Sequence, residues 1–105
     1  MRPLLVLLVD ADATRARAGI AMTAAQAALG GKAHLHIDAG AIPLLGDPAV
    51  TTAVEDACAL GAVLSLCPTG LADHAAVPPP FPDADRCGLV SLLGELADDA
   101  RLVAI

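Results

Sequence analysis

The chain has 105 residues, the size of a single domain that can bury one hydrophobic core. Its formal net charge is −6, with six Lys and Arg in all, so it lacks the basic surface that binds nucleic acids or anionic membranes. Hydrophobic residues make up 56% of the sequence, and we expect a domain this apolar to cover part of its surface with further copies of itself.

An apolar run over residues 3–9 opens the chain and shows no alternation, the pattern of a strand covered on both faces. Arg2 precedes the run as in a signal peptide, but the run is shorter than most such hydrophobic regions and Asp10 follows it directly. No segment approaches the length of a membrane-spanning helix. We therefore expect a cytoplasmic protein, whose three cysteines are free or redox-active thiols.

The next segments predict a helix and a second strand. Thr14 is the expected N-cap of an Ala-rich helix over 15–29, and Gly30 with Gly31 ends it. Residues 32–38 are typical of a strand, which is followed by a loop rich in Gly and Pro.

The second half of the chain repeats this alternation. A helix is predicted over 50–60, a strand over 62–67 and a turn of helix within 68–76. Prolines in 78–85 indicate a stiff surface loop without regular structure.

The C-terminal part predicts a helix over 88–98 and a strand over 101–105. Parallel strands joined by helical crossovers form an α/β fold, here one domain over residues 1–105 with a three-layer α/β/α sandwich. The sheet is expected to have four or five mainly parallel strands, since a strand between residues 77 and 87 is left open. Functional groups of such sheets gather beyond the carboxyl ends of the strands, and here three loops lie at this edge: Asp10–Thr14, Asp38–Leu45 and Cys67–His74.

Asp10 and Asp12 follow the first strand, as acidic residues do in phosphorylation receiver domains. Two carboxylates alone do not make the Mg²⁺ site of such a domain, and the third strand ends in Cys67 rather than in an aspartate. The favoured role of Asp10 is to cap the following turn.

Cys67 is the candidate catalytic residue, because it ends a buried strand and precedes a turn whose free amides would favour a thiolate. The alternative is a small apolar residue that only packs. His74 is the nearest base in sequence, but seven residues along a helix span about 10 Å. Cys87 is a candidate resolving thiol or has no role, and Cys58 is expected to pack inside its helix.

Residues His34, His36 and Asp38 recur at every second position, so their side chains share one face of a strand. Such neighbours lie about 6.5–7 Å apart, too far to share one metal ion without distortion. We therefore expect no metal site, and histidines that are half-buried against a helix or lie near a subunit interface.

Arg15 and Arg17 lie in the first turn of a helix, where cations are mildly unfavourable. Together with the helix amides they could hold an anion, although exposed arginines are more often only solvated. The candidate residues for binding an anion or a partner, taken from the three loops at the carboxyl edge and this helix, are Asp10, Arg15, Arg17, Gly40, Thr69, Gly70 and His74.

The order of these segments resembles the DsrE/DsrF-like family of small sulfur-relay domains, including the TusD-type subunits. The resemblance is carried by the apolar first strand, the Ala-rich helix, DAGAIPLL, GAVLSLCPTGL and the C-terminal GLVSLLGELADDARLVAI. It implies a three-layer fold, assembly into dimers, trimers or hexamers, and a persulfide on Cys67 that is passed between donor and acceptor proteins without a cofactor.

Three hypotheses follow. The first is a sulfur-relay or persulfide carrier acting through Cys67. The second is a non-catalytic oligomeric module that binds a small anionic ligand or a protein partner near Arg15, Arg17 and the loop from Asp38 to Leu45. The third is a redox sensor that pairs Cys67 with Cys87. The sequence leaves open whether the chain is an enzyme.

Overall fold

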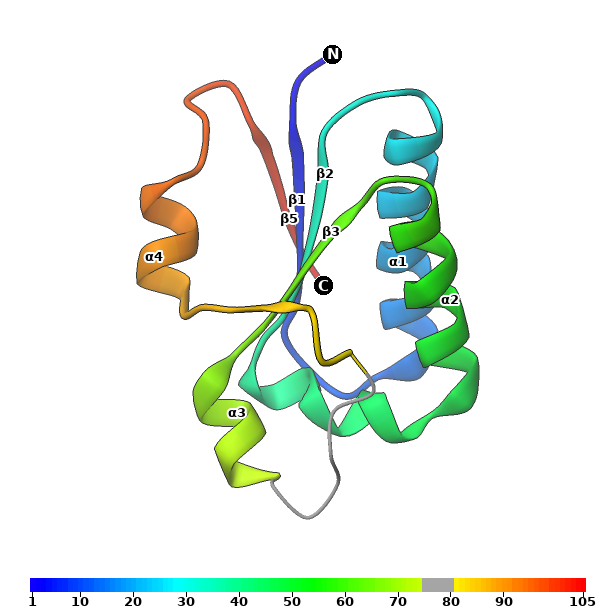
Figure 1. Cartoon of the computed structure of the whole chain (residues 1–105), viewed down its shortest axis with the longest axis vertical. Coiled ribbons are helices and arrows are strands. Elements are labelled where there is room, and N and C mark those ends of the chain that lie inside the picture. Colours follow the sequence, from blue (N-terminus) through cyan, green and yellow to red (C-terminus); the bar gives the residue numbers. More distant parts are fainter. Residues whose placement is uncertain (75–80) are drawn as a thin grey trace.

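A five-stranded parallel sheet runs through the computed structural model, which describes residues 1–74 and 81–105 (Figure 1). The strands lie in the order β4-β3-β2-β1-β5, and every neighbouring pair is parallel. Their bounds are β1 (Leu4–Leu8), β2 (Ala33–Ile37), β3 (Val63–Leu66), β4 (Asp85–Arg86) and β5 (Arg101–Ala104). The predicted three-layer α/β/α fold is confirmed, with five strands.

The two faces of the sheet are covered unequally (Figure 1). The long helices α1 (Ala13–Ala28) and α2 (Pro48–Ala59) lie on one side, and the short helix α4 (Leu89–Gly94) lies on the other. Helix α3 (Pro68–Asp73) and the 3-10 helix η1 (Ala39–Gly46) pack against each other at the carboxyl ends of the strands.

Alternation along the strands separates two hydrophobic clusters. Leu4, Val6 and Leu8 of β1 belong to the large core beneath α1 and α2. Leu5 and Leu7 point to the opposite face, where Leu92 of α4 completes a much smaller cluster. Most of the buried apolar surface that stabilises the fold therefore lies on the α1 and α2 side.

The N-cap of α1 is Asp12, so the prediction of Thr14 is wrong. The Asp12 carboxylate accepts a hydrogen bond from the Arg15 N–H at 3.1 Å, which satisfies an amide that the first helical turn leaves free. Thr14 lies inside the helix. The predicted stop is confirmed at Gly30, whose φ of +82° suits a residue without a side chain.

The segment expected as a loop over Asp38–Leu45 is mostly the helix η1. Its apolar residues drive this outcome, because Ile42 and Leu44 are buried in the large core only when the segment coils against it. The last helix, expected over 88–98, ends at Gly94, a residue of low helix propensity.

The proline-rich loop expected over 78–85 ends one residue earlier than predicted, because β4 begins at Asp85. Asp85 belongs to β4, where it pairs with Ser65 of β3, because the residues after Pro82 regain the amides that a ladder needs. Residues 78–80 of that loop, and 75–76 of the turn expected within 68–76, lie outside the described residues.

Candidate functional site

Cys67 lies where β3 ends and α3 begins. Its backbone is extended, with φ −71° and ψ 119°, and its amide donates to the carbonyl oxygen of Ile37 at 3.0 Å, continuing the ladder from β2. It is the N-cap residue of α3, but its side chain makes no capping hydrogen bond. The residue is only 8% exposed, so the thiol is at the predicted edge of the sheet but largely covered.

Cys87 follows the pairing of β4 with β3. The last register pair is Leu66 with Arg86, and the Cys87 amide donates to the Leu66 carbonyl at 3.3 Å. Continuing this register by one residue sets Cys87 beside Cys67. Neighbouring strands lie about 4.8 Å apart, within the roughly 4.4–6.8 Å between Cα atoms that a disulfide requires. Both thiols are free in this structure.

Cys58 has a different environment. It lies on α2 and packs against the large core. Burial raises the pKa of its thiol, so Cys58 stays protonated and unreactive near neutral pH. The expectation that Cys58 packs inside its helix is confirmed.

His74 is separated from Cys67 by the length of α3. Cys67 caps the N-terminal end of this helix and His74 caps the C-terminal end, with its amide donating to the Gly70 carbonyl at 3.1 Å. Six helical residues span about 9 Å, so the structure does not bring the candidate base to the thiol. His74 and the neighbouring candidate Thr69 are both exposed.

Gly40 and Gly70 let the loops at the carboxyl edge approach one another closely. A Cβ atom on Gly40 would clash with the Val9 carbonyl oxygen, and one on Gly70 would lie 2.7 Å from the Cα atom of Ala39. These two candidate binding residues therefore act in packing, since each supports backbone contact between neighbouring loops.

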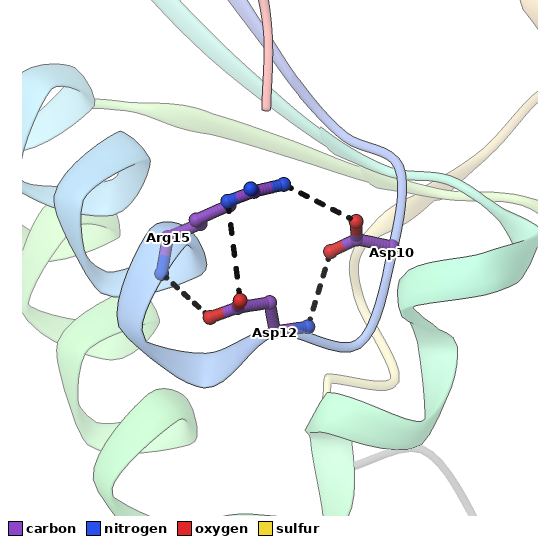
Figure 2. Close-up of polar contacts among 3 residues, drawn as sticks. All are labelled: Asp10, Asp12 and Arg15. Atoms are coloured by element: carbon purple, nitrogen blue, oxygen red, sulfur yellow. Dashed lines mark hydrogen bonds and ion pairs between the residues drawn. The ribbon is translucent and has the colours of Figure 1, made fainter.

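Arg15, in the first turn of α1, faces two carboxylates of the loop before this helix (Figure 2). Its Nη1 lies 3.8 Å from Asp10 Oδ2 and its Nε lies 3.9 Å from Asp12 Oδ2. Asp10 also accepts the Asp12 amide at 3.1 Å, which confirms its predicted role in capping the turn. The local charge of two carboxylates and one guanidinium is negative. Arg17 is exposed and has no ion pair within the described part of the chain.

A second polar cluster lies on the face of the sheet that carries α4, away from α1. His34 Nε2 is 2.8 Å and His36 Nδ1 is 2.7 Å from the Ser65 hydroxyl oxygen. His36 Nε2 is 3.7 Å from Asp38 Oδ1. The shared face of the three predicted residues is confirmed, although His36 is completely buried rather than half-buried. The sequence gives no signal for Ser65, because its partners come from another strand.

Burial is the main influence on both histidines of this cluster. It lowers the pKa of His34, although the negative charges of Asp85 and Glu95 partly oppose the shift. It also lowers the pKa of His36 against the opposing charge of Asp38. Both imidazoles are therefore neutral at neutral pH. Residues 1–74 and 81–105 contain no group of His, Cys, Asp or Glu side chains arranged to hold a metal ion.

Comparison of the sequence with models of known protein families and with curated proteins finds no match. Within the described ranges, no helix has the length and apolar character needed to cross a bilayer. The candidate functional groups are therefore the thiols at the carboxyl edge and the polar cluster on the α4 face of the sheet.

Proposed function

We propose that the chain is a small sulfur carrier in which Cys67 accepts sulfane sulfur from a persulfide donor and passes it to an acceptor thiol. One observation carries the proposal: Cys67 directly follows β3, an interior strand of a parallel sheet, at the edge where functional groups gather. Its backbone is extended there and a helix follows directly, and the family resemblance implies a persulfide at this same position.

The chemistry needs only thiols. The Cys67 thiolate attacks the outer sulfur of a donor persulfide, so that a new S–S bond forms on Cys67 as the donor S–S bond breaks and its thiolate leaves. An acceptor thiolate then attacks the outer sulfur of the persulfide and keeps it. The Sγ atom of Cys67 leaves as a thiolate and takes up a proton. No cofactor takes part. Thiol chemistry of this kind persists in a reducing compartment, which supports a cytoplasmic location.

Cys87 gives a second candidate function, favoured by the register between β4 and β3. Oxidation of the two thiols to a disulfide would pass two electrons to an oxidant and release two protons, as in a redox sensor. The same pair can resolve a persulfide. The Cys87 thiolate attacks the Cys67 sulfur, a disulfide forms, and the outer sulfur leaves as hydrogen sulfide.

We propose that copies of this protein assemble with one another. Apolar side chains that remain exposed on the α4 face of the sheet support this proposal. Val90 of α4 is 90% exposed. The other members of this set are Val63, Leu89, Leu93 and Leu102. A small domain gains stability by covering such a set, and we infer a homo-oligomer.

Mass spectrometry after incubation with glutathione persulfide tests the sulfur-carrier proposal. Wild-type protein should gain about 32 Da, one sulfur atom, on the peptide that contains Cys67, or show the Cys67–Cys87 disulfide that forms when Cys87 resolves this adduct. Cys67→Ser should gain none, and Cys58→Ser is the matched control that should be loaded like the wild type. A wild-type protein that stays unmodified while the persulfide loads a free cysteine peptide in the same tube would contradict the proposal.

A further inference from the structure

The polar cluster on the α4 face of the sheet is a continuous row of four side chains. It runs from His34 through Ser65 to His36 and then to Asp38, with successive separations of 2.8, 2.7 and 3.7 Å. Ser65 and His36 are fully buried. The Nε2 atom of His36 is the one buried side-chain nitrogen or oxygen without a hydrogen bond within the described residues.

The number of hydrogen atoms available decides which group donates and which accepts at each contact in this row. His36 Nε2 faces a carboxylate, and a bare nitrogen there would set two lone pairs against each other, so Nε2 carries the hydrogen. His36 Nδ1 is then an acceptor and takes the hydroxyl hydrogen of Ser65. The Ser65 oxygen has no second hydrogen to give, so it accepts from His34 Nε2–H. Both neutral imidazoles therefore carry their hydrogen on Nε2.

A first proton fits this arrangement. It binds to Nδ1 of His34, the acceptor nitrogen that these contacts leave unused. The hydrogen bonds that link His34, Ser65 and His36 do not change. His34 is half-buried and lines a cavity of about 460 Å³ that Lys32 and Glu95 also line. Asp85 on β4 and Glu95 beyond α4 supply negative charge to the resulting imidazolium.

A second proton breaks the arrangement. Only Nδ1 of His36 remains to take it, and this atom would then donate to Ser65 as His34 already does. The Ser65 hydrogen loses its acceptor in the row, and two positive charges flank one buried hydroxyl. Asp38 is the carboxylate that faces His36. An interior of low dielectric makes both the repulsion and the lost hydrogen bond costly.

The helix on this face of the sheet, α4, is weakly attached. Helix α4 has six residues and buries only Leu92, which packs with Leu5 and Leu7 of β1. In the parallel register these two leucines lie beside His34 and His36. Moving α4 away would therefore open the cavity beside His34 to water without disturbing the large core beneath α1 and α2.

We propose that the row of His34, Ser65, His36 and Asp38 is a proton-sensitive latch that keeps α4 on the sheet until the pair of imidazoles takes up its second proton. The proposal is independent of Cys67. Burial lowers the pKa of both histidines, so release occurs below their ordinary value of 6.5. Release exposes Leu5 and Leu7 and opens the cavity beside His34.

Amide hydrogen exchange, corrected for intrinsic rates, tests the latch. The reporters are the amides of Leu92 in α4 and of Glu95 at its C-cap, which donate to the carbonyl oxygens of Gly88 and Ser91. Between about pH 7.5 and about pH 5.5 we expect their protection to fall by about tenfold or more, while amides of α1 keep theirs. Equal pH dependence in the two helices, or none in α4, would overturn the proposal.

The matched variant is His34→Gln with His36→Asn, whose amide groups reach the positions of Nε2 and Nδ1 but do not titrate. In this variant the protection of α4 should not change between the two pH values, and retained pH dependence would contradict the latch.

Nitrogen chemical shifts of the wild-type imidazoles give a test that needs no variant. At about pH 7.5 both rings should carry hydrogen on Nε2, and an Nδ1–H tautomer of His36 would overturn the assigned donors and acceptors.

Discussion

The Nδ1 atom of His36 lies 2.7 Å from the hydroxyl oxygen of Ser65, and neither residue is exposed to solvent. Two strands that are separate in the sequence meet at this contact, because His36 of β2 pairs in register with Ser65 of β3. The neutral imidazole is the form that the contact stabilises, and stability therefore depends on pH.

We expect the free energy of unfolding to fall as the pH drops from about 7.5 to about 5.5. Burial lowers the pKa of both histidines in the folded state, so the unfolded chain binds more protons below its own value of 6.5. The stabilisation that depends on neutral histidines is fully present above pH 6.5. It is lost as the pH falls from 6.5 toward the lower pKa values of the folded state. Urea titrations should show a smaller loss in His36→Asn than in the wild type, and an equal loss would contradict this account.

The pairing of β4 with β3 predicts that Cys67 and Cys87 form a disulfide under mild oxidation, because their Cα atoms lie within bonding range if the register continues. Peptide mapping after treatment with oxidised glutathione should find the Cys67–Cys87 crosslink. Cys58 on α2 is the internal control and should stay reduced. A map in which both thiols remain free, or in which only Cys58 is modified, would argue against the redox role.

Gly70→Ala should destabilise the protein by about 1–3 kcal/mol, because the added methyl group meets the backbone of Ala39 at 2.7 Å. Gly46→Ala is the matched control, since no atom lies within 4 Å of a Cβ at that position. Thermal unfolding of the two variants measures the difference. Equal melting temperatures would show that α3 and η1 do not pack as closely as described.

Arg15→Ala should change the free energy of unfolding by less than about 1 kcal/mol, because both ion pairs are exposed and screened by water. Asp12→Ala should cost more, about 1 kcal/mol or above, because it also removes the N-cap of α1. Chemical denaturation of the two variants compares these effects. The opposite ranking would mean that the guanidinium, rather than the cap, orders this loop.

Val90→Asp should shift the protein toward monomers if copies associate through the exposed apolar residues of α4, since the charge would be buried without a partner. Leu29→Asp is the control, because Leu29 is 72% exposed but lies at the end of α1 on the other side of the sheet. Light scattering of the two variants measures the mass. Dissociation by both variants, or by Leu29→Asp alone, would exclude α4 as the interface.

Apart from η1 and β4, the sequence by itself determined the order of the helices and strands. The apolar run of β1, the Ala-rich α1 and the stop at Gly30 depend on interactions between near neighbours, so local patterns suffice to predict them. The common face of His34 and His36 follows in the same way from the period of a strand. The place of Cys67 at the end of β3 was predictable for this reason too.

Only the tertiary structure decided which segments meet. Asp85 and Arg86 form β4 because β3 offers them a free edge, and two residues carry no strand pattern of their own. The same pairing brings Cys87 toward Cys67, and the register of β2 with β3 brings Ser65 to His36. Contacts of this kind depend on how distant strands align, and the energy that aligns them comes from burying the whole core rather than from the residues in contact.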